Sequence, residues 1–247
     1  MRTFVLMPET VTPYNNEATK KEQVAEMFDN IAYRYDFLNQ LLSLGIHKGW
    51  RKKSIRFLKP LQPKQILDVA TGTGDFAIAA LKLDPDKVTG VDISEGMLKF
   101  GREKLVKENL TGKIELLTGD SENLPFPDNS FDAITVGFGV RNFENLEKGL
   151  QNMLRVLRPG GMLVVLEFSR PRKFPVKQLY NFYFKRVCPF VGRVFSKDAR
   201  AYSYLNESVN AFPDGDDFLT IMKKTGYTDV NCRPLSFGIA SIYTGKK

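Results

Sequence analysis

The stretch Asp68-Val-Ala-Thr-Gly-Thr-Gly-Asp75 decides the fold of this chain. Residues 65–70 form a short apolar run that predicts a buried strand, and residues 75–82 carry apolar side chains at helical spacing. Gly72 and Gly74 lack a Cβ, so the turn that they form can bring backbone N–H groups close to a ligand. The sequence therefore predicts a strand, a glycine turn and a helix built around a binding site.

A second acid indicates which ligand the turn binds. Asp92 ends the next apolar run, 87–92, and a carboxylate at the C-terminal end of that strand suits a ribose diol. Thr73 adds a hydroxyl to the turn. Asp68 precedes the glycines, where a carboxylate is unfavourable beside a pyrophosphate but suits an ammonium and a sulfonium group. We therefore expect S-adenosylmethionine as the cofactor, with Asp68, Gly72, Thr73, Gly74 and Asp92 around it.

The glycine pattern alone leaves an alternative open. Gly72-x-Gly74-x-x-Ala77 also satisfies the dinucleotide fingerprint, so an NAD-dependent oxidoreductase remains a candidate. Glycines that serve only close packing are a further alternative.

Strands and helices are predicted to alternate along most of the chain. Seven segments have the pattern of strands: 65–70, 87–92, 113–118, 131–136, 161–168, 229–235 and 238–244. Four segments of the same region have the pattern of helices: 75–82, 95–106, 146–157 and 214–225. The fold class is therefore α/β, a mostly parallel seven-stranded sheet with an antiparallel C-terminal strand and helices on both faces. Its ligands are expected beyond the strand C-termini, which places Asp120, Ser121 and Gly137 near the cofactor.

Composition limits the class of protein. With 247 residues and 43% hydrophobic content, the chain is long enough for one large domain. No run approaches the roughly 18 apolar residues of a membrane span, and the N-terminus lacks a signal-peptide core, so we expect a cytoplasmic protein. Cys188, Cys232 and His47 do not have the spacing of a metal site, and neither a metal nor a disulfide is expected.

Two long motifs resemble a known family. The first is Tyr35-Asp-Phe-Leu-Asn39-x-x-Leu42-Ser43-x-x-x-His47-x-x-Trp50, and the second is Arg155-Val-Leu-Arg-Pro-Gly-Gly161-x-Leu163-x-x-Leu166-Glu167-x-Ser169. Segments 124–132 and 138–142 match as well. From about residue 24 to 244 the chain is similar to the ubiquinone/menaquinone C-methyltransferases, a branch of the Rossmann-like class I S-adenosylmethionine-dependent methyltransferases.

The resemblance implies methyl transfer from S-adenosylmethionine to a ring carbon of a polyprenylated quinol. The substrate it favours is demethylmenaquinol, because segment 179–185 resembles the menaquinone branch. A substrate of the ubiquinone pathway or another lipophilic small molecule is the alternative. In this family Gly137 stands where some members have a serine that contacts the cofactor, and Asp120-Ser121 replaces a frequent Asn-Ala pair.

Four residues are the candidates for catalysis. A free phenol has a pKa near 10, and a nearby positive charge lowers such a pKa by roughly 1 to 3 units; Arg141 is expected to supply that charge, with Asn142 hydrogen-bonded to a quinol oxygen. His47 is the natural proton acceptor, and Tyr35 lies in the same motif. The alternatives are a surface salt bridge for Arg141 and a structural hydrogen bond for His47.

The net charge of +8 is confined to one segment. Residues 170–200 contain nine basic residues and one acidic residue, a surplus of eight, together with seven aromatic residues. Such a segment suits the surface of a membrane that holds a prenylated substrate. An ordinary aromatic core, a homodimer contact and nucleic-acid binding are the alternatives; we expect no nucleic acid.

Five parts of the chain follow from these patterns. They are a disordered N-terminus (1–20), a helical lid segment (21–60), the cofactor-binding core (61–169), the basic aromatic insertion over the substrate pocket (170–212) and a C-terminal helix and strand pair that complete the core (213–247).

Overall fold

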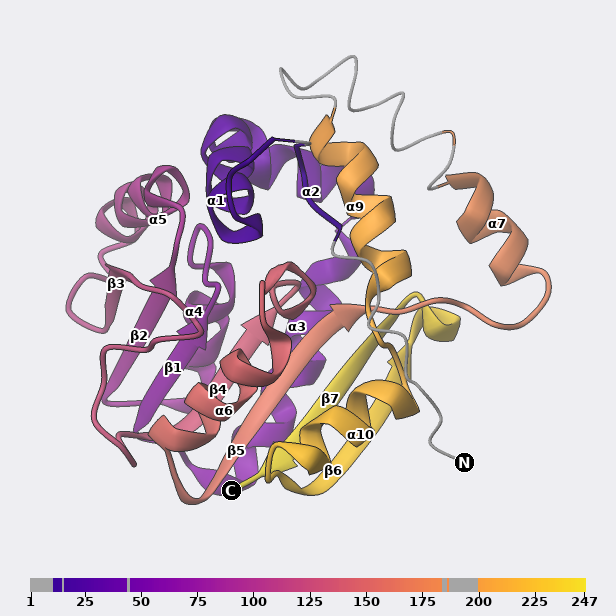
Figure 1. Ribbon diagram of the computed structural model, residues 1–247. Coiled ribbons are helices and arrows are strands. Elements are labelled where there is room, and N and C mark those ends of the chain that lie inside the picture. Colours follow the sequence, from indigo (N-terminus) through magenta and orange to yellow (C-terminus); the bar gives the residue numbers. More distant parts are fainter. Residues whose placement is uncertain (1–10, 15, 44, 184–185, 187–199) are drawn as a thin grey trace.

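A single seven-stranded sheet forms the centre of the molecule (Figure 1). The computed structural model describes residues 11–14, 16–43, 45–183, 186 and 200–247. The strands are β1 (Gln65–Val69), β2 (Lys87–Asp92), β3 (Ile114–Thr118), β4 (Phe131–Gly137), β5 (Leu157–Phe168), β6 (Thr228–Leu235) and β7 (Ala240–Lys246). Their order is β3-β2-β1-β4-β5-β7-β6, in which β1 to β5 are parallel and β7 is antiparallel to both β5 and β6. The predicted fold class is confirmed.

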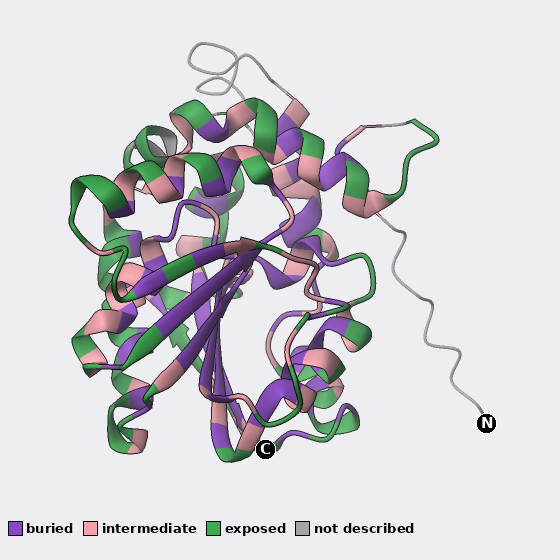
Figure 2. Ribbon diagram, turned by 90° about the vertical axis from the view of Figure 1, so that its left-hand side faces the viewer, coloured by how far each residue is buried: buried purple, intermediate pink, exposed green. Residues whose placement is uncertain are grey.

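Helices cover both faces of the sheet. They are α1 (Lys20–Ile31), α2 (Tyr35–Ser43), α3 (Ile46–Leu58), α4 (Asp75–Ala80), α5 (Glu95–Lys107), α6 (Leu146–Val156), α7 (Val176–Phe182), α9 (Arg200–Ala211) and α10 (Asp216–Lys224). Short 3-10 helices include η1 (Ala32–Arg34), η4 (Val140–Asn142) and η6 (Ser236–Gly238). Figure 2 shows the strands mostly buried between these layers.

The core consists of two apolar layers, one on each face of the sheet. One layer contains Leu150 of α6 and Phe218 of α10. The other contains Leu58 of α3 and Leu98 of α5. β5 begins at Leu157, earlier than predicted, because this residue pairs with Phe131 before the register of β4 and β5 shifts.

The order of the strands positions the site. From β1 the chain proceeds through β2 and β3 in one direction, and then crosses to β4 and β5 on the other side of β1. The loops that follow β1 and β4 therefore separate, and the space between them at the C-terminal ends of these strands is the usual ligand site of an open α/β sheet.

The predicted lid segment, 21–60, has two roles. α3 packs against β5 and α4, so this part covers the sheet. α1 and α2 contribute side chains to the cavity described below. Among the N-terminal residues next to them, Pro13 accepts a hydrogen bond at its carbonyl oxygen from Arg200 Nε at 2.7 Å. The disorder of residues 1–20 stays a prediction. Residues 1–10 and 15 lie outside the described residues.

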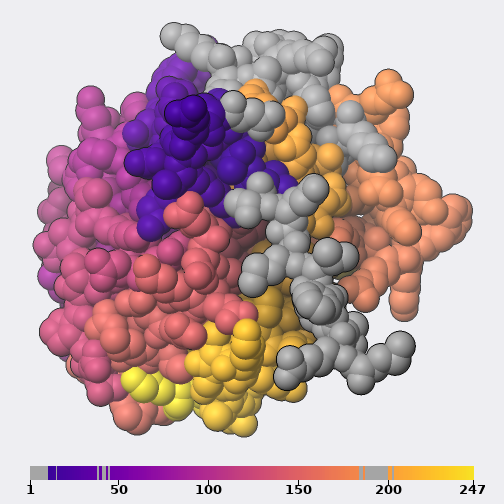
Figure 3. Space-filling model, in the orientation of Figure 1, coloured from indigo at the N-terminus to yellow at the C-terminus, as the bar shows by residue number. Residues whose placement is uncertain are grey.

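The described part of the basic aromatic insertion includes α7 and α9. α7 stands out from the body beside α9, as Figures 1 and 3 show. Residues 184–185 and 187–199, with Cys188, lie outside the described residues. In the part of the chain that is described, no helix has the length and apolarity needed to cross a membrane.

Candidate functional site

A cavity of two adjoining chambers lies beyond the strand ends. The small chamber has a volume of about 60 Å³ and the large chamber about 750 Å³. Among the described residues, seven line both chambers: Phe28, Tyr35, Ala70, Gly72, Gly137, Phe138 and Asn142. The junction therefore lies between the loops after β1 and β4 and the helices α1 and α2.

The glycine turn and Asp92 meet in the small chamber. Gly72 has φ +57° and Gly74 has φ +81°, values that favour glycine. The Asp92 carboxylate accepts hydrogen bonds from Gly72 N at 2.7 Å and Ser94 N at 2.9 Å, one on each oxygen. Each carboxylate oxygen has further acceptor capacity, so a diol has two acceptors at this position.

Asp68 does not line either chamber, and the predicted direct contact with a cationic ligand does not fit its position. Its carboxylate is fully buried and accepts hydrogen bonds from Thr71 Oγ1 at 2.6 Å and Thr135 Oγ1 at 2.7 Å. Burial raises the pKa of Asp68 to about 6, although both hydroxyls oppose that shift. Asp68 therefore holds the turn in place. Gly74 also lies outside the cavity lining and precedes α4.

The two predicted residues after β3 line the small chamber. Ser121 lies there beside Asp120. Asp120 already has protein partners, because Lys21 of α1 donates to its Oδ2 at 2.5 Å and Glu122 N donates to its Oδ1 at 2.9 Å. A ligand amine at Asp120 would therefore compete with Lys21.

A polar network joins the glycine turn to α2. Thr73 Oγ1 donates to Asp36 Oδ1 at 2.6 Å. Lys104 Nζ lies 2.5 Å from Asp36 Oδ2 and 2.9 Å from Asp75 Oδ1, and Arg51 lies 2.7 Å from Asp75 Oδ2. Thr73 thus lines the large chamber and also anchors the lid segment. The sequence offered no signal for Lys104 or Arg51, since their partners lie on distant elements.

Aromatic rings form the wall of the large chamber beside Gly137. The rings of Phe138 and Phe168 have centroids 4.6 Å apart, and Trp50 lies 6.3 Å from Phe138. A Cβ on Gly137 would lie 2.7 Å from Phe76 Cδ2. A serine would therefore clash in this packing, and only the backbone of Gly137 faces the cavity.

Arg141 is buried and paired, so it is not a surface arginine. Its Nη1 lies 2.8 Å from Glu167 Oε1 and also donates to the carbonyl oxygen of Phe138. Burial raises the pKa of Glu167, while the charge of Arg141 opposes the shift. The positive charge predicted at Arg141 is thus largely balanced by Glu167, a partner that the sequence did not indicate. Asn142, next to Arg141 on η4, lines both chambers.

His47 lines the large chamber in its neutral form. Ser43 Oγ donates its hydrogen to the carbonyl oxygen of Asn39 at 2.6 Å, so it accepts from Nδ1 of His47. The imidazole then keeps its Nε2 lone pair as a base. Burial, followed by the charge of Arg51, lowers the pKa of His47 below 6.5. Tyr35 is at the junction, and burial raises the pKa of its hydroxyl.

The described residues contain no cluster of three or more His, Cys, Asp or Glu side chains that could hold a metal ion.

Comparison with known proteins identifies the family. The ubiE/COQ5 methyltransferase family matches residues 16–247. This chain belongs to that family. A demethylmenaquinone methyltransferase of Bacteroides fragilis is 52% identical over 240 residues, which cover 97% of this chain and 98% of the relative. One from Porphyromonas gingivalis is 48% identical over 242 residues, with coverage of 97% and 99%.

Solved structures show the same fold. A SAM-dependent methyltransferase from Thermotoga maritima has a TM-score of 0.59 at 22% identity and covers 90% of this chain and 99% of its own. Phosphoethanolamine N-methyltransferase 2 of Haemonchus contortus, in complex with S-adenosyl-L-methionine, has a TM-score of 0.54 at 16% identity, with coverage of 74% and 48%. The resemblance expected from the two motifs is confirmed, and the oxidoreductase alternative is set aside.

The buried carboxyl of Asp68 predicts a particular pH dependence of stability. Its pKa is about 6 in the folded chain and 3.8 in the unfolded one, so the folded state holds an extra proton between these values. The contribution of Asp68 to the free energy of unfolding is therefore lost as the pH rises through about 6. An asparagine does not titrate, so the free energy of unfolding of Asp68→Asn should increase by roughly 3 kcal/mol relative to that of the wild type as the pH rises from about 4 to 7. Urea denaturation across that range measures it, and a constant difference would contradict the assignment.

Proposed function

We propose that this methyltransferase transfers a methyl group from S-adenosylmethionine to a ring carbon of demethylmenaquinol. The name of its relatives and the shape of the cavity support this proposal. A small chamber with the Asp92 carboxylate adjoins a larger chamber with an aromatic wall at Gly137, Phe138 and Asn142, which suits a nucleoside donor beside a hydrophobic ring. That junction is the observation that carries the proposal.

The residues of the small chamber fit the cofactor. Asp92 offers two carboxylate oxygens to the ribose diol, and Gly72 leaves open the space that a side chain would fill. Asp120 and Ser121 are proposed to contact the adenine. When bound, S-adenosylmethionine supplies an electrophilic methyl group on its sulfonium sulfur.

The residues of the large chamber are proposed to prepare the ring. The nucleophile is a ring carbon beside a hydroxyl, and loss of the hydroxyl proton increases its electron density. His47 is proposed to accept that proton at Nε2, since its pKa below 6.5 leaves it unprotonated at neutral pH. Arg141, balanced by Glu167, would orient the ring oxygen by a hydrogen bond more than by net charge. Tyr35 would pack over the ring at the junction.

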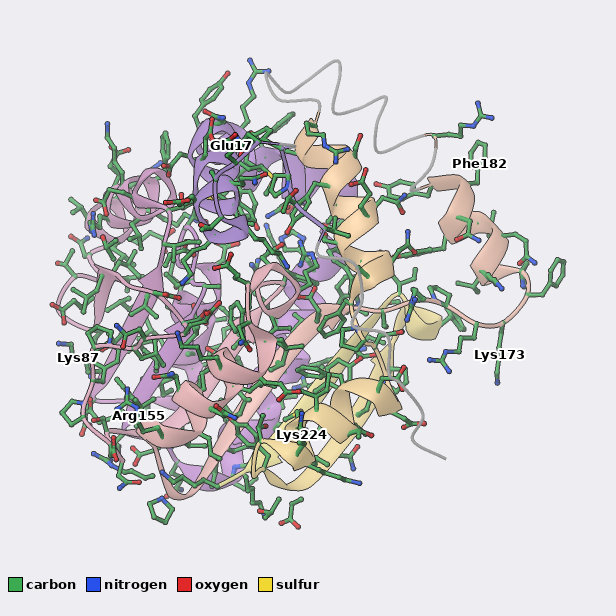
Figure 4. The ribbon with its side chains drawn as sticks, in the orientation of Figure 1. Glu17, Lys87, Arg155, Lys173, Phe182 and Lys224 are labelled. Atoms are coloured by element: carbon green, nitrogen blue, oxygen red, sulfur yellow. The ribbon has the colours of Figure 1, made fainter. Side chains whose placement is uncertain are left out.

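The mouth of the large chamber supports a substrate that comes from a membrane. Leu179, Phe182 and Phe237 line the chamber and yet are 65%, 63% and 85% exposed. Figure 4 shows Lys173 and Phe182 on the segment that projects from the body. We propose that this exposed apolar and basic surface docks on anionic lipid. The prenyl tail would then stay in the bilayer while the ring enters the chamber.

The direct test of the proposed function is turnover. Purified protein should form S-adenosylhomocysteine with demethylmenaquinol, faster with anionic lipid present, and more slowly with the matching ubiquinone precursor. No product with demethylmenaquinol, but turnover of the ubiquinone precursor, would move the substrate to the alternative pathway.

The ribose assignment predicts the effect of Asp92→Ala. Loss of hydrogen bonds to a charged acceptor should weaken S-adenosylmethionine binding by about ten-fold or more. Calorimetry measures the affinity. Asp128→Ala is the control, since Asp128 is exposed and pairs only with Arg155 among the described residues. Equal affinities of Asp92→Ala and wild type would remove Asp92 from the cofactor site.

His47 predicts an acid limb in the pH profile. Protonation below its pKa removes the base, so kcat/KM of the wild type should fall as the pH decreases through a midpoint under 6.5. In His47→Gln the plateau should fall roughly 100-fold and this limb should disappear. Cofactor affinity should stay the same. An unchanged limb in the variant would assign the titration to another group.

The docking surface predicts a charge effect on vesicle binding. The double variant Lys173→Glu/Lys177→Glu should bind vesicles of anionic phospholipid at least about ten-fold more weakly, because each lysine contributes about 1 kcal/mol near such a surface. The control is Lys82→Glu/Lys87→Glu; Lys87 lies on the opposite side of the molecule in Figure 4. Equal losses in both variants would contradict a localised surface. Wild-type protein that binds RNA but does not bind vesicles would favour the nucleic-acid alternative.

A further inference from the structure

Three residues of the large chamber each have one polar side-chain atom that is buried without a hydrogen-bond partner among the described residues. These atoms are Nε of Arg141, Oδ1 of Asn142 and the hydroxyl of Tyr204. All three residues line the large chamber. A buried polar atom without a partner costs free energy, so three of them on one cavity indicate a ligand that supplies the missing bonds.

Two other polar atoms of these side chains, Nη1 of Arg141 and Nδ2 of Asn142, are already engaged. Arg141 Nη1 contacts Glu167 and Phe138, and Asn142 Nδ2 donates to the carbonyl oxygen of Phe138 at 3.4 Å. These bonds fix both side chains in place. The buried atoms left without a partner are a donor, Nε of Arg141, and an acceptor, Oδ1 of Asn142.

Tyr204 comes from α9, far from η4 in the sequence. Its side chain is 1% exposed and packs with Val24, Met27 and Ala201. Burial raises the pKa of its hydroxyl, and Arg141 and then Glu167 are the charges that influence it most. The ring is therefore held by apolar contacts of its own, on a helix that packs against η4, the element that carries Arg141 and Asn142.

We propose that Tyr204 is a substrate-binding residue, and that its hydroxyl, Nε of Arg141 and Oδ1 of Asn142 together bind one ring hydroxyl of the acceptor. This inference rests on the proposed function and specifies which form of the ring the site takes. Asn142 Oδ1 can only accept, so the ligand atom must carry a hydrogen. Arg141 Nε can only donate, so the same atom must offer a lone pair. A phenolic O–H meets both demands, and the hydroxyl of Tyr204 provides the third hydrogen bond.

The oxidised ring meets only part of these demands. A quinone carbonyl accepts from Arg141 and Tyr204, but it leaves Oδ1 of Asn142 buried and unpaired. The three atoms therefore select the reduced, dihydroxy ring, which is also the form with a nucleophilic carbon. The selectivity acts at binding, before any methyl transfer.

The variant Tyr204→Phe tests the assignment. It removes only an oxygen that has no described partner, so thermal unfolding should occur at the wild-type temperature or above. The kcat/KM for demethylmenaquinol should fall about ten-fold or more, and the affinity for S-adenosylhomocysteine should stay unchanged. The control is Tyr227→Phe, which loses a hydrogen bond to the carbonyl oxygen of Leu150 away from the cavity and should lower stability without changing kcat/KM.

The outcomes distinguish a failure of the inference about Tyr204 from a failure of the proposed function. Wild-type kcat/KM in Tyr204→Phe, with wild-type protein active, would overturn the inference alone. Inactive wild-type protein would overturn the proposed function.

The preference for the reduced ring is tested separately by comparing the binding affinities of the two redox forms. Fluorescence of Trp50, the single tryptophan of the chain and a residue of the chamber wall, reports binding of a short-chain menaquinone in its oxidised and dithionite-reduced forms. The reduced form should bind about ten-fold more tightly. Equal affinities would overturn the assignment of a ring hydroxyl to Asn142.

Discussion

The buried carboxylate of Asp68 is the constraint on which the site depends. It accepts one hydrogen bond from the turn after β1 and one from β4, at the point where the strand order reverses. These two bonds connect the strands whose loops diverge around the cavity. Gly72 is then placed to donate to Asp92, and the carboxylate of Asp92 is held at the wall of the small chamber. A residue that touches no ligand thus fixes the two that are proposed to do so.

The net charge near the large chamber is small, so Arg141 is expected to act on a ligand through directed hydrogen bonds more than through its charge. Arg141 and Glu167 form a buried pair, and an isolated buried charge would be much more costly. Nε of Arg141 is buried and has no hydrogen-bond partner among the described residues. Electrostatic help from a net positive charge, as the sequence suggested, is correspondingly smaller.

The sequence predicted the parts of the site that follow from strand order. Gly72 and Asp92 meet because the C-terminal ends of parallel strands share an edge, and their spacing after apolar runs is visible in one dimension. Asp68 illustrates a limit: the strand pattern places it correctly, but only the fold shows that Thr135 accompanies it. Thr73 and Arg141 illustrate another. Their partners, Asp36 and Glu167, come from elements whose packing no local pattern specifies. No sequence pattern indicated Tyr204 as a substrate-binding residue. Its proposed role depends on buried atoms of Arg141 and Asn142 that have no hydrogen-bond partner, and both residues lie on a different element.

The two chambers give the account its central claim: the nucleoside part of the donor lies with Asp92, and the acceptor ring lies with Arg141 across the junction at Phe138. A crystal structure with S-adenosylhomocysteine and a short-chain menaquinol measures this most directly. We predict both ribose hydroxyls on the carboxylate of Asp92 and a ring hydroxyl within hydrogen-bond distance of Arg141 Nε. A nucleoside bound in the large chamber, or a quinol ring outside it, would contradict the account.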